Sequence, residues 1–254
     1  FAFTLFELAK RVRHVTMAAD PRLIPYWQHH FPDWTFLNRH ALKEAPPSDY
    51  AAPNGALVPL FFDALKAAPD TIKHPLLVPN SARSAVIEKL LSERKKPLIG
   101  VCWRGGSGVN GKVRSLSLDK LMSGLPDDAD VMLTSLQYSG SPGEEIQTLG
   151  DPRLALSGLN NRDDLDGVFA LLSHCDAVLT IDNAVAHFAC ALGKPVHILI
   201  PAGQAQFRWK NPELRKLFFP TAQLHIQDDA GAWEAPVARA WQVILDDMEG
   251  LKNA

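Results

Sequence analysis

The chain has 254 residues, of which 46% are hydrophobic and 21% are charged, and its formal net charge at pH 7 is -2. This length and composition are typical of a globular protein with one large or two small domains that each have a core. Because the charge is near zero and no apolar run approaches the roughly 20 residues that span a bilayer, we expect no nucleic-acid partner and no transmembrane segment.

The first 80 residues alternate short elements with loops. A stretch rich in Pro, Ala and Ser over residues 44–59 favours loops, and residues 74–79 resemble an extended linker. A helix is predicted after this linker, over Ser81–Ser92, with Ser81 as its N-cap. The elements expected before the linker are helices over Phe3–Lys10 and Leu23–His30 and strands over Val12–Met17 and Trp34–Leu37.

From Lys96 onward, apolar strands alternate with helices, which predicts a parallel sheet covered by helices on both faces. We predict an α/β fold with two Rossmann-type units, one over residues 1–80 that is truncated at its start and a nucleotide-sugar-binding one over 81–235, followed by a C-terminal helix over 236–254. Predicted strands cover Leu98–Trp103, Val131–Leu136, Ala177–Ile181, Val196–Ile200 and Leu224–Ile226. Predicted helices cover Ser117–Ser123, Asp163–His174, Asn183–Leu192 and Pro236–Met248.

The segment over residues 177–200 is the most informative part of the chain. Two β-branched runs flank a helix of small residues, which predicts a βαβ unit with a right-handed crossover. The helix follows Asp182, the predicted N-cap, and ends before Gly193, the predicted C-cap. Its N-terminus lies at the carboxyl edge of the sheet, where free N–H groups and the helix dipole suit a phosphate. His187 lies on the same helix face as Asn183, although an ordinary crossover helix with a surface histidine fits the pattern about equally well.

A glycine-rich loop over residues 104–115 follows the predicted strand that ends at Trp103, and it carries Arg104, Lys112 and Arg114. Glycine permits a close approach of the backbone to a ligand, and the cations suit a phosphate. The glycine and lysine spacings fit neither a Walker loop nor a GxGxxG fingerprint. The alternative interpretation is a flexible surface loop.

Two further segments follow strands at the same edge of the predicted sheet. Gln137 ends the second strand, where its amide either reads a base edge or is solvated. Phe207, Arg208 and Trp209 follow the strand that ends at Ile200. A planar cation beside aromatic rings suits stacking on a base or a sugar, and a packed corner is the alternative.

The sequence predicts neither a metal site nor a disulfide. Asp128 and Asp130 precede a strand at its amino end, and Asp164 and Asp166 lie on a helix, where residues i and i+2 do not face each other. We therefore interpret both Asp-x-Asp pairs as chance matches. The scattered Cys102, Cys175 and Cys190 predict buried free thiols in a reducing cytoplasm.

The chain begins without Met, inside a predicted helix, and its apolar start lacks a basic leader and a cleavage site. We therefore do not interpret this start as a signal peptide, and we expect the chain to be a piece of a longer cytoplasmic protein.

Six segments together resemble a known group: Gly100–Gly106, Arg114–Leu118, Ser135–Gln137, Leu179–His187, Ala191–Val196 and Phe207–Trp209. In this order they are similar to the catalytic module of bacterial TPR-associated glycosyltransferases. That group resembles the ADP-heptose:lipopolysaccharide heptosyltransferase family and, more distantly, the protein O-GlcNAc transferases. All share the GT-B fold of two Rossmann units. The resemblance covers about residues 97–235 well and residues 11–31 weakly.

The resemblance implies that the second unit holds the nucleotide diphosphate of a sugar donor. Asp182 and His187 match an Asp-Thr-x-x-x-His pattern whose side chains and helix N–H groups face the diphosphate, and Asn183 replaces the threonine with an amide that can still donate. The implied nucleotide-sugar-binding residues are Trp103, Arg104, Gly105, Arg114, Ser115, Gln137, Asp182, Asn183, Ala184 and His187. Phe207, Arg208 and Trp209 are the candidates for base or sugar stacking.

The activity implied by the resemblance is that of a metal-independent, inverting hexosyl- or heptosyltransferase with a glycan or protein acceptor and no cofactor besides the donor substrate. In the relatives, the acceptor-activating carboxylate precedes the segment that matches Phe1–Lys10, so we expect the catalytic base upstream of Phe1. A non-catalytic nucleotide-sugar-binding scaffold and a GT-B-fold nucleotide-sugar epimerase are the alternatives. The sugar, the base and the acceptor stay open, lipopolysaccharide, flagellin and other proteins included.

Overall fold

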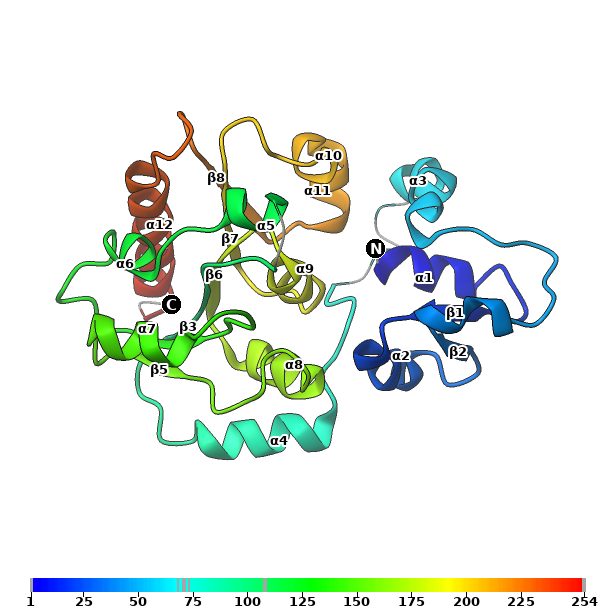
Figure 1. Ribbon diagram of the computed structural model, residues 1–254, viewed down its shortest axis with the longest axis horizontal. Helices are drawn as coiled ribbons and strands as arrows, with labels where there is room; N and C mark the ends of the chain where they lie inside the picture. The colour runs from blue at the N-terminus through cyan, green and yellow to red at the C-terminus, as the bar shows by residue number, and fades with distance from the viewer. Residues whose placement is uncertain (1, 68, 70–71, 73, 107–108, 253–254) are drawn as a thin grey trace.

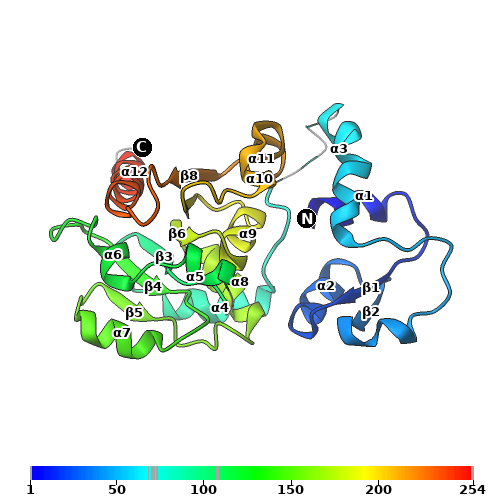
Figure 2. The same ribbon diagram turned by 45° about the horizontal axis from the view of Figure 1, so that its top comes forward.

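The computed structural model describes residues 2–67, 69, 72, 74–106 and 109–252. They form two α/β units, one around a two-stranded parallel sheet and one around a six-stranded parallel sheet (Figure 1). The small unit lies beside helices of the large unit and away from the C-terminal helix, as a second view also shows (Figure 2). The sheets confirm the predicted α/β class with parallel strands.

The small unit contains the four elements expected before residue 40. Its strand β1 begins four residues later than predicted, because Val12 is exposed and the register with β2 begins at Thr16, opposite Thr35. Helix α3 was not predicted, although Leu57, Phe61 and Leu65 recur at helical spacing and are buried. The elements are α1 (Ala2–Ala9), β1 (Thr16–Ala19), α2 (Ile24–His30), β2 (Thr35–Asn38) and α3 (Leu57–Ala67), with 3-10 helices at Pro21–Leu23, Arg39–Glu44 and Asn54–Ala56.

The sheet of the large unit has the strand order β5-β4-β3-β6-β7-β8, and all its strands are parallel. The five predicted strands are present. Strand β5 was missed, because it has three residues and its Leu156 is 54% exposed. The strands are β3 (Leu98–Cys102), β4 (Met132–Ser135), β5 (Leu154–Leu156), β6 (Ala177–Ile181), β7 (Val196–Ile200) and β8 (Ala222–Ile226).

The helices of the large unit include all those predicted after residue 80. The N-cap of α4 is Asn80, whose side chain accepts from the Arg83 amide, so the expectation of Ser81 was wrong by one residue. Helices α5, α7, α10 and α11 were not predicted. The helices are α4 (Ser81–Leu90), α5 (Val109–Arg114), α6 (Leu118–Met122), α7 (Pro142–Leu149), α8 (Leu165–His174), α9 (Ala184–Ala191), α10 (Phe207–Lys210), α11 (Pro212–Phe218) and α12 (Glu234–Lys252).

Successive residues of the buried strands point to opposite faces of the six-stranded sheet. Val178 and Ile198 belong to a core shared with α8 and α9, whereas Leu179 and Leu199 belong to a core shared with α6 and α12. In the second core, Trp241 of α12 donates its indole N–H to the Leu121 carbonyl oxygen at 2.7 Å. Helices therefore cover both faces, as the near-continuous apolar strands predicted.

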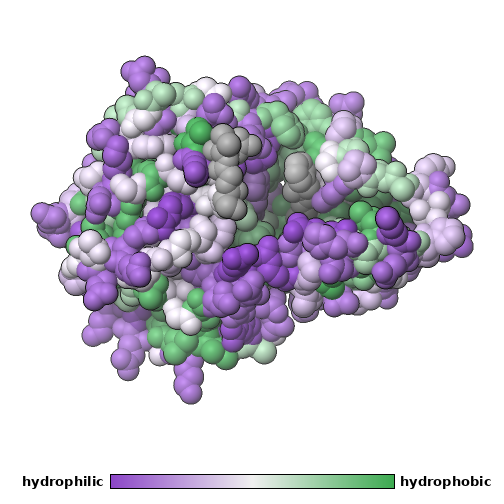
Figure 3. Space-filling view, viewed as in Figure 1, coloured by the Kyte–Doolittle hydropathy of each residue, from purple (hydrophilic) through white to green (hydrophobic). Residues whose placement is uncertain are grey.

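The two units share one apolar core. Tyr26 of α2 stacks on Phe169 of α8 with ring centroids 3.9 Å apart, and Phe3 of α1 stacks on Phe218 of α11. A cavity of about 100 Å³ between the units is lined by these elements and by His187 of α9. The space-filling view shows a hollow where the units meet (Figure 3).

The predicted free thiols are confirmed, since Cys102, Cys175 and Cys190 are buried and unbridged. Burial raises the pKa of each thiol to about 12. Within the part of the chain that the structure describes, every helix is too short or too polar to cross a membrane.

Gly124 packs closely against helix α12, and a substitution at this position tests that contact. A Cβ at this position would lie 2.9 Å from the Ala238 Cα atom, a backbone atom that has no flexible end to move. We predict that Gly124→Ala lowers the free energy of unfolding by about 1–3 kcal/mol. Gly143→Ala is the control, because its Cβ would meet only Leu156 at 3.7 Å and alanine favours helix α7. Thermal unfolding checks this, and equal melting temperatures for the two variants would contradict it.

A buried histidine pair predicts acid sensitivity. His197 Nδ1 of β7 lies 3.1 Å from His225 Nε2 of β8, and burial lowers the pKa of each imidazole to about 4. The unfolded chain therefore binds more protons than the folded chain between pH 6.5 and 4, so stability falls as the pH drops through this range. Urea unfolding at pH 7 and pH 5 measures the loss. The double variant His197→Gln/His225→Gln should lose less on acidification, and an equal loss would assign the effect to other groups.

Candidate functional site

The centre of the large sheet is a topological switch point. Strands β3 and β6 are neighbours there, and the chain proceeds from β3 to β4 and β5 on one side and from β6 to β7 and β8 on the other. Loops that leave the carboxyl ends of two such strands diverge and open a crevice, in which α/β folds bind ligands. The predicted site residues follow β3, β4, β6 and β7, so the topology brings these segments to one edge.

Asp182 directly follows β6 at this switch point and is 1% exposed. Arg208 Nη2 donates to its Oδ1 at 2.9 Å. Arg114 Nη1 lies 3.5 Å from its Oδ2 and donates to its backbone oxygen at 2.7 Å. A carboxylate buried this deeply needs cationic partners, and the loops on both sides of β6 supply one each. The prediction that Asp182 caps the following helix was wrong, because its carboxylate is engaged by these two arginines.

Asn183 is the N-cap of α9. Its Oδ1 accepts from the amides of Val185 at 2.9 Å and Ala186 at 3.4 Å, while its Nδ2 donates to Cys102 Sγ at 3.2 Å. The amide expected to donate to a ligand is therefore used to tie the end of β6 to the end of β3. Ala184, the first residue of α9, is exposed at the crevice.

At the other end of α9 the C-cap is Leu192, so the predicted C-cap Gly193 was wrong by one residue. Gly193 follows the helix with φ +70, the left-handed conformation that favours glycine after a helix C-terminus. The predicted βαβ unit is therefore present from strand to strand.

His187 lies one turn into α9, where it is partly buried and stacks on Trp209 with ring centroids 5.3 Å apart. Burial and the nearby Arg208 charge lower the pKa of its imidazole to about 3. His187 is thus neutral at physiological pH. It can offer a hydrogen bond to a ligand but not a positive charge.

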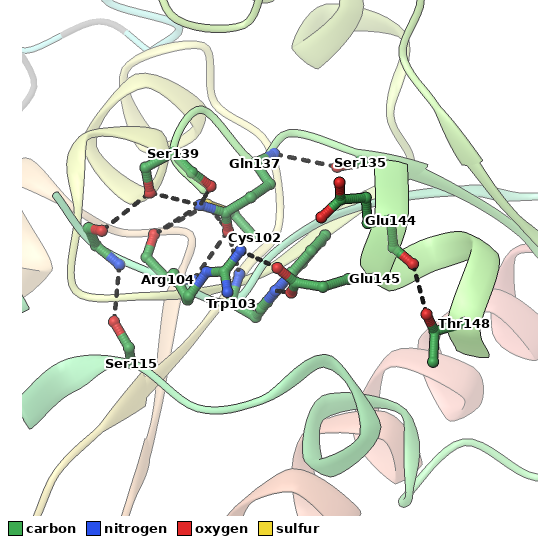
Figure 4. A network of polar contacts seen from close by, with 11 residues as sticks. Cys102, Trp103, Arg104, Ser115, Ser135, Gln137, Ser139, Glu144, Glu145 and Thr148 are labelled. Carbon is green, nitrogen blue, oxygen red and sulfur yellow. Dashed lines mark hydrogen bonds and ion pairs between the residues drawn. The ribbon is translucent and has the colours of Figure 1, made fainter. Parts of the chain in front are cut away.

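Arg104 and Trp103, which follow β3, share one carboxylate (Figure 4). Trp103 Nε1 donates to Glu145 Oε2 at 2.7 Å, and Arg104 forms an ion pair with the same side chain. The Trp103 side chain is fully buried, and its predicted place in the nucleotide cleft stays a prediction. Glu145 was missed, because it lies on α7 and no motif links it to β3.

Gln137 is buried, so the alternative of a solvated amide was wrong, while its contact with a base edge stays a prediction. Its Oε1 accepts from the backbone amides of Trp103 at 3.1 Å and Arg104 at 2.9 Å, and its Nε2 donates to the Arg104 carbonyl at 3.2 Å and to Ser139 Oγ at 2.9 Å (Figure 4). Gln137 therefore binds the loop that follows β3.

The three residues of the segment Phe207–Trp209 have different surroundings. Trp209 is 0% exposed and packs on His187 and Phe219, which excludes it as a stacking surface in this structure. Arg208 pairs with Asp182, and Phe207 is 58% exposed. Phe207 is the member of the segment whose ring is open to a ligand, while Trp209 forms the packed corner.

The two Asp-x-Asp pairs lie outside the crevice. Asp130 precedes β4 at its amino end and pairs with Lys96 at 3.0 Å. Asp164 caps α8 by accepting from the Gly167 amide at 2.9 Å, and it pairs with Arg83. Among the residues that the structure describes, no cluster of three His, Cys, Asp or Glu side chains is arranged to hold a metal.

No established protein-family model matches the chain. Protein FlbA of Caulobacter vibrioides is 25% identical over 259 residues, an alignment that covers 91% of this chain and 41% of that protein. The chain thus spans about two fifths of the length of this relative.

The solved structures show the fold. A glycosyl transferase family 9 structure from Veillonella parvula superposes with a TM-score of 0.53 at 12% identity and covers 98% of this chain and 76% of that one. E. coli ADP-heptose lps heptosyltransferase II gives a TM-score of 0.48 at 17% identity over 69% of this chain and 52% of that one. The fold is α/β and of the GT-B type, as expected. The resemblance to TPR-associated and O-GlcNAc transferases stays a prediction.

The cap of α9 yields a stability prediction. Asn183→Ala removes the acceptor of two helix amides and the donor to Cys102, so the free energy of unfolding should fall by about 1–2 kcal/mol. Asn183→Thr keeps a capping oxygen and should recover part of the loss. Chemical denaturation measures both variants. An Asn183→Ala variant as stable as the parent would show that the cap is not needed.

Proposed function

We propose that the chain is the nucleotide-sugar-binding part of a glycosyltransferase that transfers a sugar from a nucleoside-diphosphate donor to a glycan or protein acceptor. The observation that carries this proposal is the convergence of Arg114 and Arg208 on Asp182 at the switch point of the sheet, beside the first turn of α9. The GT-B fold of the Veillonella parvula transferase family 9 structure supports it.

The charges of the crevice favour an anion. Two arginines pair with the single carboxylate of Asp182, which brings two cationic side chains to the switch point, whereas Arg104 pairs with Glu145. The N-terminus of α9 adds the positive end of a helix dipole at the same place. A diphosphate that enters the crevice gains charge-assisted hydrogen bonds from arginines that are already held in position.

This arrangement suits the departure of a nucleoside diphosphate. As the bond between the anomeric carbon and the phosphate oxygen breaks, the sugar becomes oxocarbenium-like and negative charge builds up on the diphosphate. Arg114 and Arg208 stabilise this charge without a metal, and electrostatic stabilisation of this kind is a large term in enzymatic catalysis. The acceptor oxygen then attacks from the opposite face, so the reaction inverts the anomeric centre.

Other residues have supporting roles in this proposal. His187 donates a hydrogen bond to the phosphate as a neutral imidazole, and Phe207 offers its exposed ring to the base or the sugar. We assign no residue of the chain as the base that takes the acceptor proton. Three buried free thiols suit a reducing compartment, so we infer a cytoplasmic reaction.

Calorimetric titration with UDP, GDP, ADP and CMP in the presence of EDTA tests the donor class. The proposal predicts tight binding of one nucleoside diphosphate without a metal and weaker binding of CMP. Binding that requires a divalent cation would contradict the metal-independent mechanism. The absence of binding to all four nucleotides would contradict the proposed function.

Substitution of the two arginines locates the site. Arg114→Ala and Arg208→Ala should each weaken diphosphate binding by about 10- to 100-fold, since each removes a charge-assisted hydrogen bond. Arg153→Ala is the matched control, because Arg153 also pairs with an aspartate, Asp151 at 2.7 Å, but next to β5 and outside the crevice. Calorimetry with the nucleotide that the parent binds measures all three. Parental affinity in both crevice variants would place the binding site elsewhere.

A further inference from the structure

We propose that Ser115 and Ser139 form a hydroxyl clamp, which holds the peptide groups of Gly105 and thereby positions Arg114 for the diphosphate. This inference rests on the proposed function and assigns the two serines a positioning role. Neither hydroxyl is required to touch the ligand, in contrast to the direct contact predicted for Ser115 from the sequence.

The clamp acts on both backbone polar groups of Gly105. The Gly105 amide donates to Ser115 Oγ at 3.0 Å, and Ser115 Oγ donates in turn to the Gly111 carbonyl at 2.6 Å. The Gly105 carbonyl accepts from Ser139 Oγ at 3.0 Å, and the Gln137 amide donates to the same hydroxyl. Gly105 is thus held by two serines that lie in separate loops, one after α5 and one after β4.

Gln137 extends the clamp to the preceding residues. Its carboxamide binds the amides of Trp103 and Arg104 and the carbonyl of Arg104. Side chains therefore hold three successive residues after β3. Backbone groups outside regular structure need such partners when they are buried, and here the partners also fix the path of the loop.

Gly105 and Gly106 lie so close to Gly111 that a short side chain such as serine can bridge them. A Cβ on Gly111 would lie 1.8 Å from the Gly106 carbonyl oxygen, and a Cβ on Gly105 would lie 3.3 Å from the Gly111 Cα atom. The two ends of the loop thus touch backbone to backbone. Ser115 bridges them, because its Oγ can accept from one side and donate to the other.

The clamp reaches the anion site through Arg114. Ser115 immediately follows Arg114, and Arg114 donates to the Asp182 backbone oxygen at 2.7 Å. Holding Ser115 against Gly105 and Gly111 fixes the backbone from which the arginine projects. A loop released from the clamp has to be ordered when the ligand binds, and that ordering costs affinity.

The test uses the nucleoside diphosphate, among UDP, GDP and ADP, that the parent chain binds most tightly in EDTA. Ser115→Ala and Ser139→Ala should each reduce its affinity about 5- to 10-fold, the scale of one lost hydrogen bond. Both serines are only partly buried, so both variants should fold. Ser115→Thr and Ser139→Thr keep the hydroxyl and should restore most of the affinity.

Ser123→Ala is the matched control, because the Ser123 hydroxyl donates to the Lys120 carbonyl at 2.9 Å on an exposed turn outside the crevice. It should bind the nucleotide as the parent does. Combining Ser115→Ala with Arg114→Ala distinguishes a Ser115 that positions Arg114 from a Ser115 that contacts the nucleotide directly. If Ser115 acts through Arg114, Ser115→Ala should cause no further loss in that background, whereas a full additional loss would overturn the positioning role.

Two outcomes distinguish this inference from the proposed function. If the parent binds a nucleoside diphosphate and both Ser→Ala variants bind it equally well, the clamp is wrong and the proposed function stands. If the parent binds none of the three, the proposed function and the clamp are both wrong.

Discussion

The buried carboxylate of Asp182 is the constraint around which the site is built. It lies at the carboxyl end of a central strand with 1% exposure, where an unpaired charge would be strongly destabilising. The loops after β3 and β7, which are the neighbours of β6, each send one arginine to it. Asp182 thus keeps two cations at the switch point of the sheet, where a helix N-terminus also begins. The proposed stabilisation of a diphosphate depends on this arrangement.

Polar side chains near Asp182 bind the ends of strands β3 and β6 and the loop that follows β3. Asn183 caps α9 and reaches Cys102 on the neighbouring strand, so the ends of β3 and β6 are tied together. Gln137 and two serines fix the loop after β3, and Glu145 anchors Trp103 and Arg104. Several polar side chains for which the sequence suggests contact with a ligand therefore form hydrogen bonds within the protein. In the proposed function, these side chains contribute to binding by preorganising the site.

The sequence predicts the framework well and the polar contacts poorly. Strands β6 and β7 were predicted residue for residue, because continuous apolar runs bounded by polar residues mark buried parallel strands. The N-cap of α9 was misplaced by one residue, because Asp and Asn cap equally well and only the distant Arg208 decides between them. The buried indole of Trp103 donates to Glu145, 42 residues away, and the local sequence pattern does not predict that contact.

A crystal structure of the chain with its tightest-binding nucleoside diphosphate tests the central claim most directly. The account predicts diphosphate oxygens within hydrogen-bond distance of Arg114 and Arg208, beside the first turn of α9. A diphosphate bound elsewhere, with both arginines still engaged only by Asp182, would contradict it.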